Sequence, residues 1–281
     1  MSEFGADQIA VITGTRPAVI YHGIDTETFY PVSPERPIVM PMKDGLTVLR
    51  SRNDCKRFWG ADHNRTWLFR ADRHMPRKRY PSLFRAVAPV LMRHPDVDMV
   101  YHCRTSDQGG NLEDAKSKYR PEIAARMMST GLNDTFGGVD RRALNALYNA
   151  ADIYVSVSAE GFGLTIAEAM AAGVPAVGLG YSSVPEVIGA EVPADWTEPY
   201  VEGAGGLIVR PGGLVDNPYD HFWASVDEHA FGQAVEHLVA HRKRRRELGW
   251  LASRHVAKTF SWATAARQFS DIIASRIQVA A

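Results

Sequence analysis

The chain has 281 residues, of which 45% are hydrophobic and 23% charged, a composition that suits a soluble protein with a packed core. Its 32 Lys and Arg residues equal its 32 Asp and Glu residues, so net charge argues neither for nor against a polyanionic partner. Its two cysteines, Cys55 and Cys103, give neither a disulfide framework nor a metal-ligand spacing. No signal region and no apolar run of about 20 residues is present, so we expect a cytoplasmic protein without a membrane span.

The first 65 residues are predicted to form an N-terminal arm that joins the main domain. Residues 9–13 and 18–21 are expected to be short strands, and the Pro-rich stretch 31–50 is interpreted as an insertion.

Residues 66–281 are predicted to form one α/β domain, because apolar strand patterns alternate with helical ones. This alternation indicates a parallel sheet with helices on both faces, whose ligands bind beyond the carboxyl ends of the strands. The expected strands are 66–69, 98–102, 151–157, 176–179 and 206–209. The expected helices are 82–93, 123–129, 141–150, 228–241 and 262–277, and the basic run 241–246 is interpreted as a solvated helix end.

The most informative segment is 158–175, which reads as a glycine-containing turn that opens a helix. Gly161 and Gly163 leave the turn without side-chain bulk, so that a ligand can approach the backbone closely. The unpaired amides of Gly163, Leu164 and Thr165 would then point outward at a helix N-terminus, where phosphate is favoured.

Two carboxylates flank these amides. Glu160 precedes the turn and Glu168 lies on the helix, and both could accept hydrogen bonds from hydroxyl groups. Either glutamate alone could be an ordinary residue of its element, since Glu is a good helix former. Together with the amides, however, the pair suits a nucleotide-sugar.

The whole string resembles the signature of the family-4 glycosyltransferases, which are retaining enzymes of the GT-B fold. That signature reads Glu-Gly-Phe-Gly-Leu, three residues, Glu-Ala-Met-Ala, one residue, Gly, one residue, Pro, and every named position is matched here. Residues 183–189 and 205–209 resemble the family's next elements, and 22–31 resembles the segment that opens its C-terminal domain, with His22 in place of the usual Asn. The resemblance implies a Rossmann-like parallel sheet with helices on both faces, corresponding to the C-terminal, donor-binding half of a GT-B enzyme without its acceptor-binding domain.

The resemblance also implies roles for a basic loop after the first strand of the domain. Arg73 and Lys78 match the family's Arg-x4-Lys element, which binds the donor diphosphate in place of a divalent metal, so no metal and no further cofactor is expected. Asp72 and Arg79 stand where glycine is usual, which puts the loop geometry in question. A solvated basic loop and a nucleic-acid patch are the alternatives.

By the same resemblance, Glu160 would hold hydroxyls of the donor sugar and act with Arg73 and Lys78 in catalysis. Glu168 would hold the ribose hydroxyls. The backbone of the turn would contact sugar and phosphate, and a later loop would pack on the nucleobase unless its residues serve only loop packing. The residues expected to bind the donor are therefore Gly161, Phe162, Gly163, Leu164, Thr165, Glu168, Gly138 and Val139.

Three functions remain open. The first is a retaining, metal-independent glycosyltransferase that uses a nucleotide-diphospho-sugar, or the donor half of one. The second is a non-catalytic nucleotide-sugar-binding subunit that forms a homo-oligomer or joins a separate acceptor-domain chain. The third is a DNA-modifying glycosyltransferase that holds nucleic acid through its basic stretches.

Overall fold

The computed structural model describes residues 2–132, 139–216 and 222–280. Its centre is a seven-stranded sheet in the order β10-β11-β9-β8-β3-β4-β7. All neighbouring strands are parallel except β10, which pairs with β11 in the antiparallel sense. The strands are β3 (Thr66–Ala71), β4 (Val97–His102), β7 (Met127–Ser129), β8 (Ile153–Ser156), β9 (Ala176–Leu179), β10 (Tyr200–Gly203) and β11 (Gly206–Val209).

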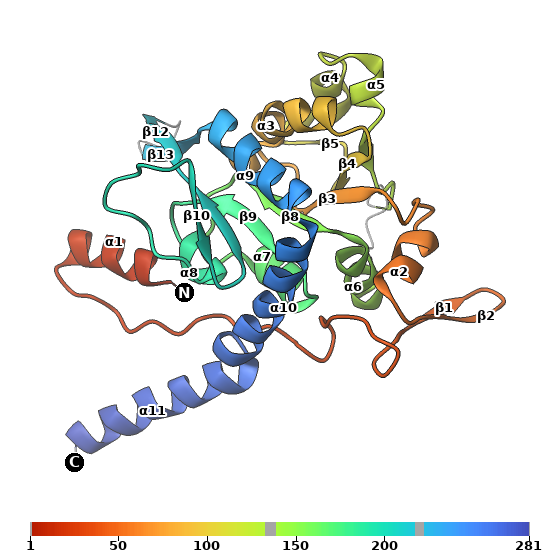
Figure 1. The fold of residues 1–281 in the computed structure, drawn as a ribbon. Coiled ribbons are helices and arrows are strands. Elements are labelled where there is room, and N and C mark those ends of the chain that lie inside the picture. The colour runs from red at the N-terminus through yellow and green to blue at the C-terminus, as the bar shows by residue number, and fades with distance from the viewer. Residues whose placement is uncertain (1, 133–138, 217–221, 281) are drawn as a thin grey trace.

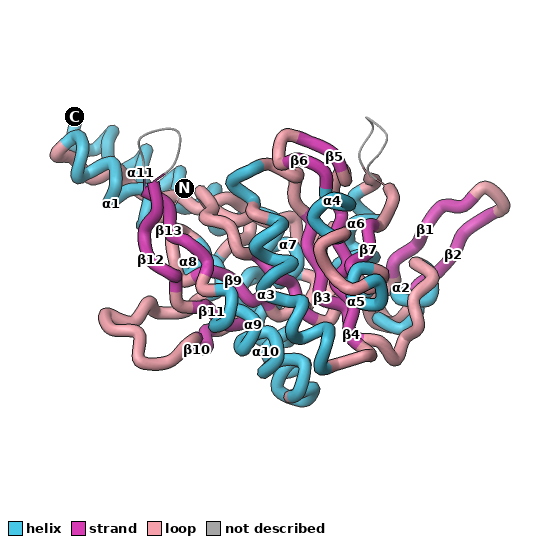
Figure 2. Tube along the Cα trace, turned by 90° about the horizontal axis from the view of Figure 1, so that it is seen from above, coloured by secondary structure: helices cyan, strands magenta, loops and turns pink. Residues whose placement is uncertain are grey.

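Helices cover both faces of this sheet, as Figures 1 and 2 show. On one face α3 (Tyr80–Arg93) and α9 (Glu228–Ala240) enclose one apolar core cluster, together with the short α4 (Leu112–Lys116) and α5 (Pro121–Ala124). On the other face α2 (Arg52–Phe58), α6 (Arg141–Ala150), α7 (Leu164–Ala171) and α8 (Val184–Ile188) enclose a second cluster. The helix α10 (Arg242–Thr259) contributes to both. The predicted α/β class, with a mainly parallel sheet between two helical layers, is confirmed.

The sheet forms where the sequence is most uniformly apolar. Every residue of β3, β4, β8, β9 and β11 is buried, as expected for parallel strands with both faces covered. The bounds predicted for the strands 176–179 and 206–209 agree with β9 and β11. Two short hairpins are separate from this sheet: β5 (Ser106–Asp107) pairs with β6 (Gly110–Asn111), and β12 (Pro211–Asp216) pairs with β13 (Phe222–Val226).

The N-terminal arm differs from the prediction. Residues 9–13 belong to the helix α1 (Glu3–Thr13), and no strand forms over 18–21. The helix is favoured because Ser2 caps it and the Glu186 carboxylate accepts hydrogen bonds from the amides of Glu3 and Phe4, both at 2.8 Å. The Pro-rich stretch contains the hairpin β1 (Ile38–Met42) and β2 (Gly45–Leu49), which projects from the body in Figure 1.

Two further predicted elements are wrong. Residues 123–129 are not one helix: α5 ends at Ala124, and β7 then extends the sheet by pairing with β4. The basic run 241–246 is largely exposed, but it does not lie where the macrodipole favours cations, because it opens the 18-residue helix α10.

The last helix is tied to the N-terminal arm. The amide of Ile24 donates to the Phe260 carbonyl at 2.6 Å, and Ile24 forms a parallel bridge with Ser261. From there α11 (Trp262–Ala280) projects away from the body (Figure 1). In the described part of the chain, no helix has both the length and the apolar character needed to cross a bilayer.

Candidate functional site

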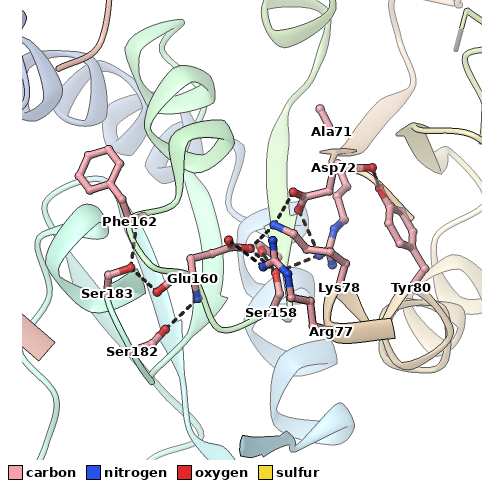
Figure 3. Close-up of polar contacts among 12 residues, drawn as sticks. Ala71, Asp72, Arg77, Lys78, Tyr80, Ser158, Glu160, Phe162, Ser182 and Ser183 are labelled. Atoms are coloured by element: carbon pink, nitrogen blue, oxygen red, sulfur yellow. Dashed lines mark hydrogen bonds and ion pairs between the residues drawn. The ribbon is translucent and has the colours of Figure 1, made fainter. Parts of the chain in front are cut away.

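Strand order reverses between β3 and β8, the point at which open α/β sheets typically form a crevice. After β3 the chain adds β4 and β7 on one side, and after β8 it adds β9 and β11 on the other. The loops that leave these two strands therefore diverge, which is the arrangement in which open α/β sheets bind ligands beyond the strands' carboxyl ends. The basic loop follows β3 and the signature turn follows β8, and Figure 3 shows their side chains meeting there.

Lys78 lies at the centre of this meeting point. Its Nζ is 2.5 Å from Glu160 Oε1 and 2.6 Å from Asp72 Oδ1. All three side chains are at most 10% exposed. The one-turn helix η1 (Pro76–Lys78) presents the lysine, and Arg79 ends that turn with φ of 52°. Arg79 therefore adopts the left-handed conformation for which glycine is best suited.

Arg70 supports the same network from inside β3. Its side chain is fully buried and donates to Ser158 Oγ at 3.0 Å and to Asp72 Oδ2 at 3.2 Å. Its Nε and Nη1 have no hydrogen-bond partner among the described residues. Arg70 was not predicted as a site residue, although a single arginine in an otherwise apolar strand is itself a signal.

The environment of Glu160 keeps its carboxylate charged. Burial would raise the pKa of Glu160, but the charge of Lys78 and hydrogen bonds from Lys78 and Ser158 hold it below its ordinary value. Arg77 lies 3.6 Å from the other carboxylate oxygen. Glu160 is thus a fixed, ionised acceptor beside a group of cations.

Two serines fix the backbone of the signature turn. Ser182 Oγ accepts from the Glu160 amide at 3.0 Å. Ser183 Oγ lies within hydrogen-bond distance of the carbonyls of Glu160 and Phe162, at 2.7 and 2.9 Å. Figure 3 shows both serines on the side of the turn away from Lys78. The turn is therefore held in place by side chains that leave its other side free.

The helix after the turn begins as predicted. Gly163 has φ of 103° and precedes α7, which has no side-chain cap, so first-turn amides such as those of Leu164 and Thr165 lack a capping acceptor. Gly161 is exposed, and a Cβ placed on it would meet nothing within 4 Å. The ring of Phe162 is buried and packs against Phe260 and Tyr21. Phe162 can therefore offer a ligand its backbone but not its side chain.

Glu168 lies one turn along α7. Tyr148 Oη on α6 donates to its Oε2 at 2.9 Å. Burial raises the pKa of Glu168, and the bond from Tyr148 offsets part of the increase. The Tyr148 hydroxyl was not identified from the sequence, because no local pattern links the two helices.

The remaining predicted residues lie apart from Lys78. Arg73, whose side chain is 61% exposed, pairs with Asp107 at 2.9 Å and is not part of the Lys78 network. Val139 is partly buried and packs against the core beneath α6. Gly138 lies outside the described residues. The structure thus brings Lys78 and Glu160 into contact but leaves Arg73 on an adjacent surface.

Comparisons with known proteins agree with this architecture. The family described as Glycosyl transferases group 1 matches residues 65–240. The alpha-maltose-1-phosphate synthase of Mycolicibacterium smegmatis is 27% identical over 255 residues, which are 90% of this chain and 55% of that protein. The C-terminal domain of the group 1 protein LpcC from Francisella tularensis aligns with a TM-score of 0.59 and 19% identity, covering 85% of this chain and 100% of that domain.

A further solved structure, Anabaena Alr3699/HepE in complex with UDP, aligns with a TM-score of 0.67 and 17% identity, covering 98% of this chain and 63% of that one. The chain thus spans about half the length of its curated relative, and its fold is that of the C-terminal half of a GT-B protein. With more than half of its residues matched by the family profile, this chain belongs to the group 1 glycosyltransferases.

Proposed function

We propose that this chain is the donor-binding half of a retaining, metal-independent glycosyltransferase that uses a nucleotide-diphospho-sugar. The observation that carries the proposal is the meeting of Lys78 with the signature turn at the carboxyl ends of β3 and β8. Departure of a nucleoside diphosphate from a sugar places negative charge on the phosphates, and cations fixed near that position stabilise it.

The chain's own residues are suited to this task. Lys78 carries three N–H donors, of which Asp72 and Glu160 engage two. Arg77 is half-exposed beside Glu160, and the N-terminus of α7, which directly follows the turn, has no side-chain cap. These cations and amides would hold the diphosphate without Mg²⁺, whose usual protein ligands are carboxylates.

The two glutamates would divide recognition of the donor. Glu160, kept ionised by Lys78, would accept hydrogen bonds from hydroxyls of the transferred sugar. Glu168, oriented by Tyr148, would accept from the ribose. The UDP complex of the Anabaena protein with the same fold makes uridine the first base to test. Retention of configuration and the absence of a metal are supported by the likeness of the signature, and we assign no general base.

The decisive measurement is calorimetric titration of UDP and GDP in the presence of EDTA. We expect at least one of them to bind with EDTA present, and Glu168→Gln to weaken that binding. Binding that appears only after a divalent cation is added would contradict the role given to Lys78.

A second candidate is a nucleotide-sugar-binding subunit that works with an acceptor domain on another chain. It is favoured by the apolar side chains of Trp262, Phe269 and Ile273 on α11, which are 59%, 57% and 45% exposed. Positioning of two substrates in a closed cleft supplies about 7–11 kcal/mol of a barrier. We therefore expect these 281 residues alone to bind a nucleotide-sugar yet release nucleotide slowly.

A coupled assay for released nucleotide, run beside light scattering on the same sample, separates these candidates. Rapid turnover by a monomer would exclude the subunit and show that the chain contains its own acceptor site.

A further inference from the structure

A second concavity lies at the amino ends of β8 and β9, at the opposite end of the strands from the signature turn. Its volume is about 540 Å³. Asp152, which precedes β8, and Gly173 and Pro175, which precede β9, form one wall. The start of α2 and the first three turns of α10 form the others. All of its lining residues belong to the described part of the chain.

We call this concavity the rear pocket, and its lining is strongly cationic. Six of its side chains are Lys or Arg, whereas Asp152 is the single acid among the residues that line it. The chain as a whole is neutral, so this concentration of charge is local. The cations are Arg50, Arg52, Lys56, Arg242, Arg245 and Arg246.

Two buried cations form the floor and share the one carboxylate. Lys56 is 4% exposed and donates to Asp152 Oδ2 at 2.5 Å. Arg245 is 6% exposed, and its Nη2 lies 3.7 Å from the other oxygen of Asp152. Arg245 also donates to the Leu238 carbonyl at 2.9 Å. Carbonyl bonds satisfy donors but do not neutralise charge, so the floor retains excess positive charge.

The rim of the pocket adds three arginines whose side chains are unpaired in the described part of the chain. Arg50, Arg242 and Arg246 are exposed, and within the described residues none of their side chains takes part in an ion pair or hydrogen bond. Burial lowers the pKa of Arg245 and the charge of Asp152 opposes this, whereas repulsion from Arg242, Arg52 and Arg246 adds to the lowering. An anion in the pocket would relieve this repulsion.

A purely structural role explains only part of this cluster. Arg52 donates to the carbonyls of Ala151 and Gly173 and so holds the start of α2 against the loops before β8 and β9. Lys56 does the same through Asp152. Fastening does not require the three rim arginines, whose convergence on one concavity brings like charges together at a cost in stability.

The chemistry of the pocket specifies the class of ligand. Guanidinium groups match phosphate oxygens in pairs, and Ser33 and Ser253 add hydroxyls to the lining. Trp250 and Pro34 supply apolar surface. The volume falls within the range of about 300–1,000 Å³ that is typical of small-molecule sites, and it exceeds what a bare phosphate needs.

We propose that the rear pocket binds a small phosphorylated metabolite, at a site separate from the crevice between β3 and β8. The pocket touches the far ends of both elements that carry that crevice. Asp152 precedes β8, which leads to Ser158 and Glu160, and Gly173 follows α7, which begins at the signature turn. Occupancy of the rear pocket is therefore placed to influence the crevice.

The test is hydrogen–deuterium exchange with inorganic pyrophosphate, a hexose 6-phosphate or adenosine diphosphate, each against sodium chloride of equal ionic strength. We expect at least one of the three to slow exchange in residues 50–56 and 242–250. In the variant Arg242→Gln/Arg246→Gln this protection should vanish, and the Kd measured by calorimetry should rise at least tenfold. Both rim residues are exposed, so the variant is expected to fold normally.

A matched control has the same change in net charge on the same helix. Lys243→Gln/Lys258→Gln removes two exposed lysines of α10 that do not line the pocket, and it should retain protection and affinity. Protection confined to residues 158–168, equal protection by chloride, or equal loss in the control would overturn the proposal. Tight binding of duplex DNA with no binding of the three small anions would also overturn it, in favour of a polyanion surface.

This result is independent of the proposed function. Glu168→Gln should leave protection at 50–56 and 242–250 unchanged, because Glu168 lies on the crevice side. Failure of UDP to bind the crevice would remove the donor-binding proposal and leave the rear pocket standing.

Discussion

The Tyr148 hydroxyl on α6 is a fixed donor to Glu168 on α7, 2.9 Å away. Burial raises the pKa of Tyr148 well above its ordinary value, so the phenol stays protonated. Burial also raises the pKa of Glu168, although Tyr148 limits the increase. The pair thus holds a carboxylate whose charge is easily lost, at the position where the ribose is expected.

The first prediction concerns pH. If ionised Glu168 accepts the ribose hydroxyls, affinity should fall as the pH is lowered through its raised pKa, at a higher pH than an ordinary glutamate of pKa about 4.3 would give. Uridine is the ligand of choice, because it has no phosphate that titrates in this range. Calorimetry from pH 7.5 to 4.5 should show this fall in affinity for uridine in the wild type. Glu168→Gln should bind uridine weakly at every pH, and in Tyr148→Phe the fall in affinity should occur at a higher pH.

The same shift has an opposite consequence for stability. A glutamate whose pKa is raised on folding contributes stability that is complete below its unfolded pKa and is lost as the pH rises through its folded pKa. At pH 7, Glu168→Gln should therefore melt at a temperature equal to or above that of the wild type, and the difference should shrink toward pH 4. A marked loss of melting temperature at pH 7 would instead assign Glu168 a structural role.

The second prediction concerns Lys78. Lys78→Met leaves Asp72 and Glu160 as buried carboxylates without their cation, and breaking a buried pair of this kind costs about 3–5 kcal/mol. Because the pKa of Glu160 is lowered in the fold, its stabilising effect is present above its unfolded pKa and is lost as the pH falls. The loss in the free energy of unfolding, measured with urea, should thus be large at pH 7 and smaller at pH 4.

Arg73→Met is the matched control for that variant, since it removes a cation from the same loop. Its side chain is 61% exposed and pairs with Asp107 at the surface, and such pairs contribute about 0–1 kcal/mol. A loss in the free energy of unfolding as large as that of Lys78→Met would show that Arg73 supports the loop in a way its contacts do not reveal.

The third prediction separates the two glutamates. Glu168→Ala removes a charge-assisted bond to the ribose, worth about 1.5–3 kcal/mol, and should weaken free UDP accordingly. Glu160→Gln should leave the affinity for UDP within a few fold and reduce the discrimination between UDP-glucose and UDP-galactose. Competition titrations measure both effects. Equal losses of UDP affinity in the two variants would refute the division of roles.

The fourth prediction compares the two turn glycines. Gly163 has φ of 103°, and an added Cβ would lie 3.3 Å from Ile166 Cδ1, so Gly163→Ala should cost about 1–3 kcal/mol in stability through backbone strain. A Cβ added at Gly161 would meet no atom within 4 Å, so Gly161→Ala should change stability by less than about 1 kcal/mol. Comparable melting temperatures for the two variants would mean that the turn relaxes easily.

Sequence reasoning worked best where burial alone decides the structure. The strands 176–179 and 206–209 were predicted with their observed bounds, because both are short apolar runs whose residues are all buried. It failed on α10, whose buried side includes Arg245, Gly249 and Ala252. Few large apolar residues mark that helix, so its periodicity is weak.

Local pattern also could not separate a short strand from a helix. Over residues 123–129 the choice depends on Met127–Ser129 pairing with β4, a contact distant in sequence. Similarly, α1 is stabilised by Glu186, more than 180 residues away. In both cases a tertiary contact overrode the local preference.

The candidate site shows the same limit. Lys78 and Glu160 were each predicted, but their contact across 82 residues follows only from the adjacency of β3 and β8. Arg73 was expected beside Lys78, yet it pairs with Asp107. Asp72, which stands where the family often has glycine, engages Lys78 and Arg70 and so organises the loop around its charge.

The bridge between Ile24 and Ser261 bears on the order of events during synthesis. It joins residues far apart in the sequence, so it forms only after all seven strands of the central sheet have been synthesised. Closing so long a loop costs only about 0.6 kcal/mol more than closing one half as long. This bridge is therefore expected to form after the strands of the sheet and after the contact of α1 with Glu186, and any truncation before residue 261 would abolish it.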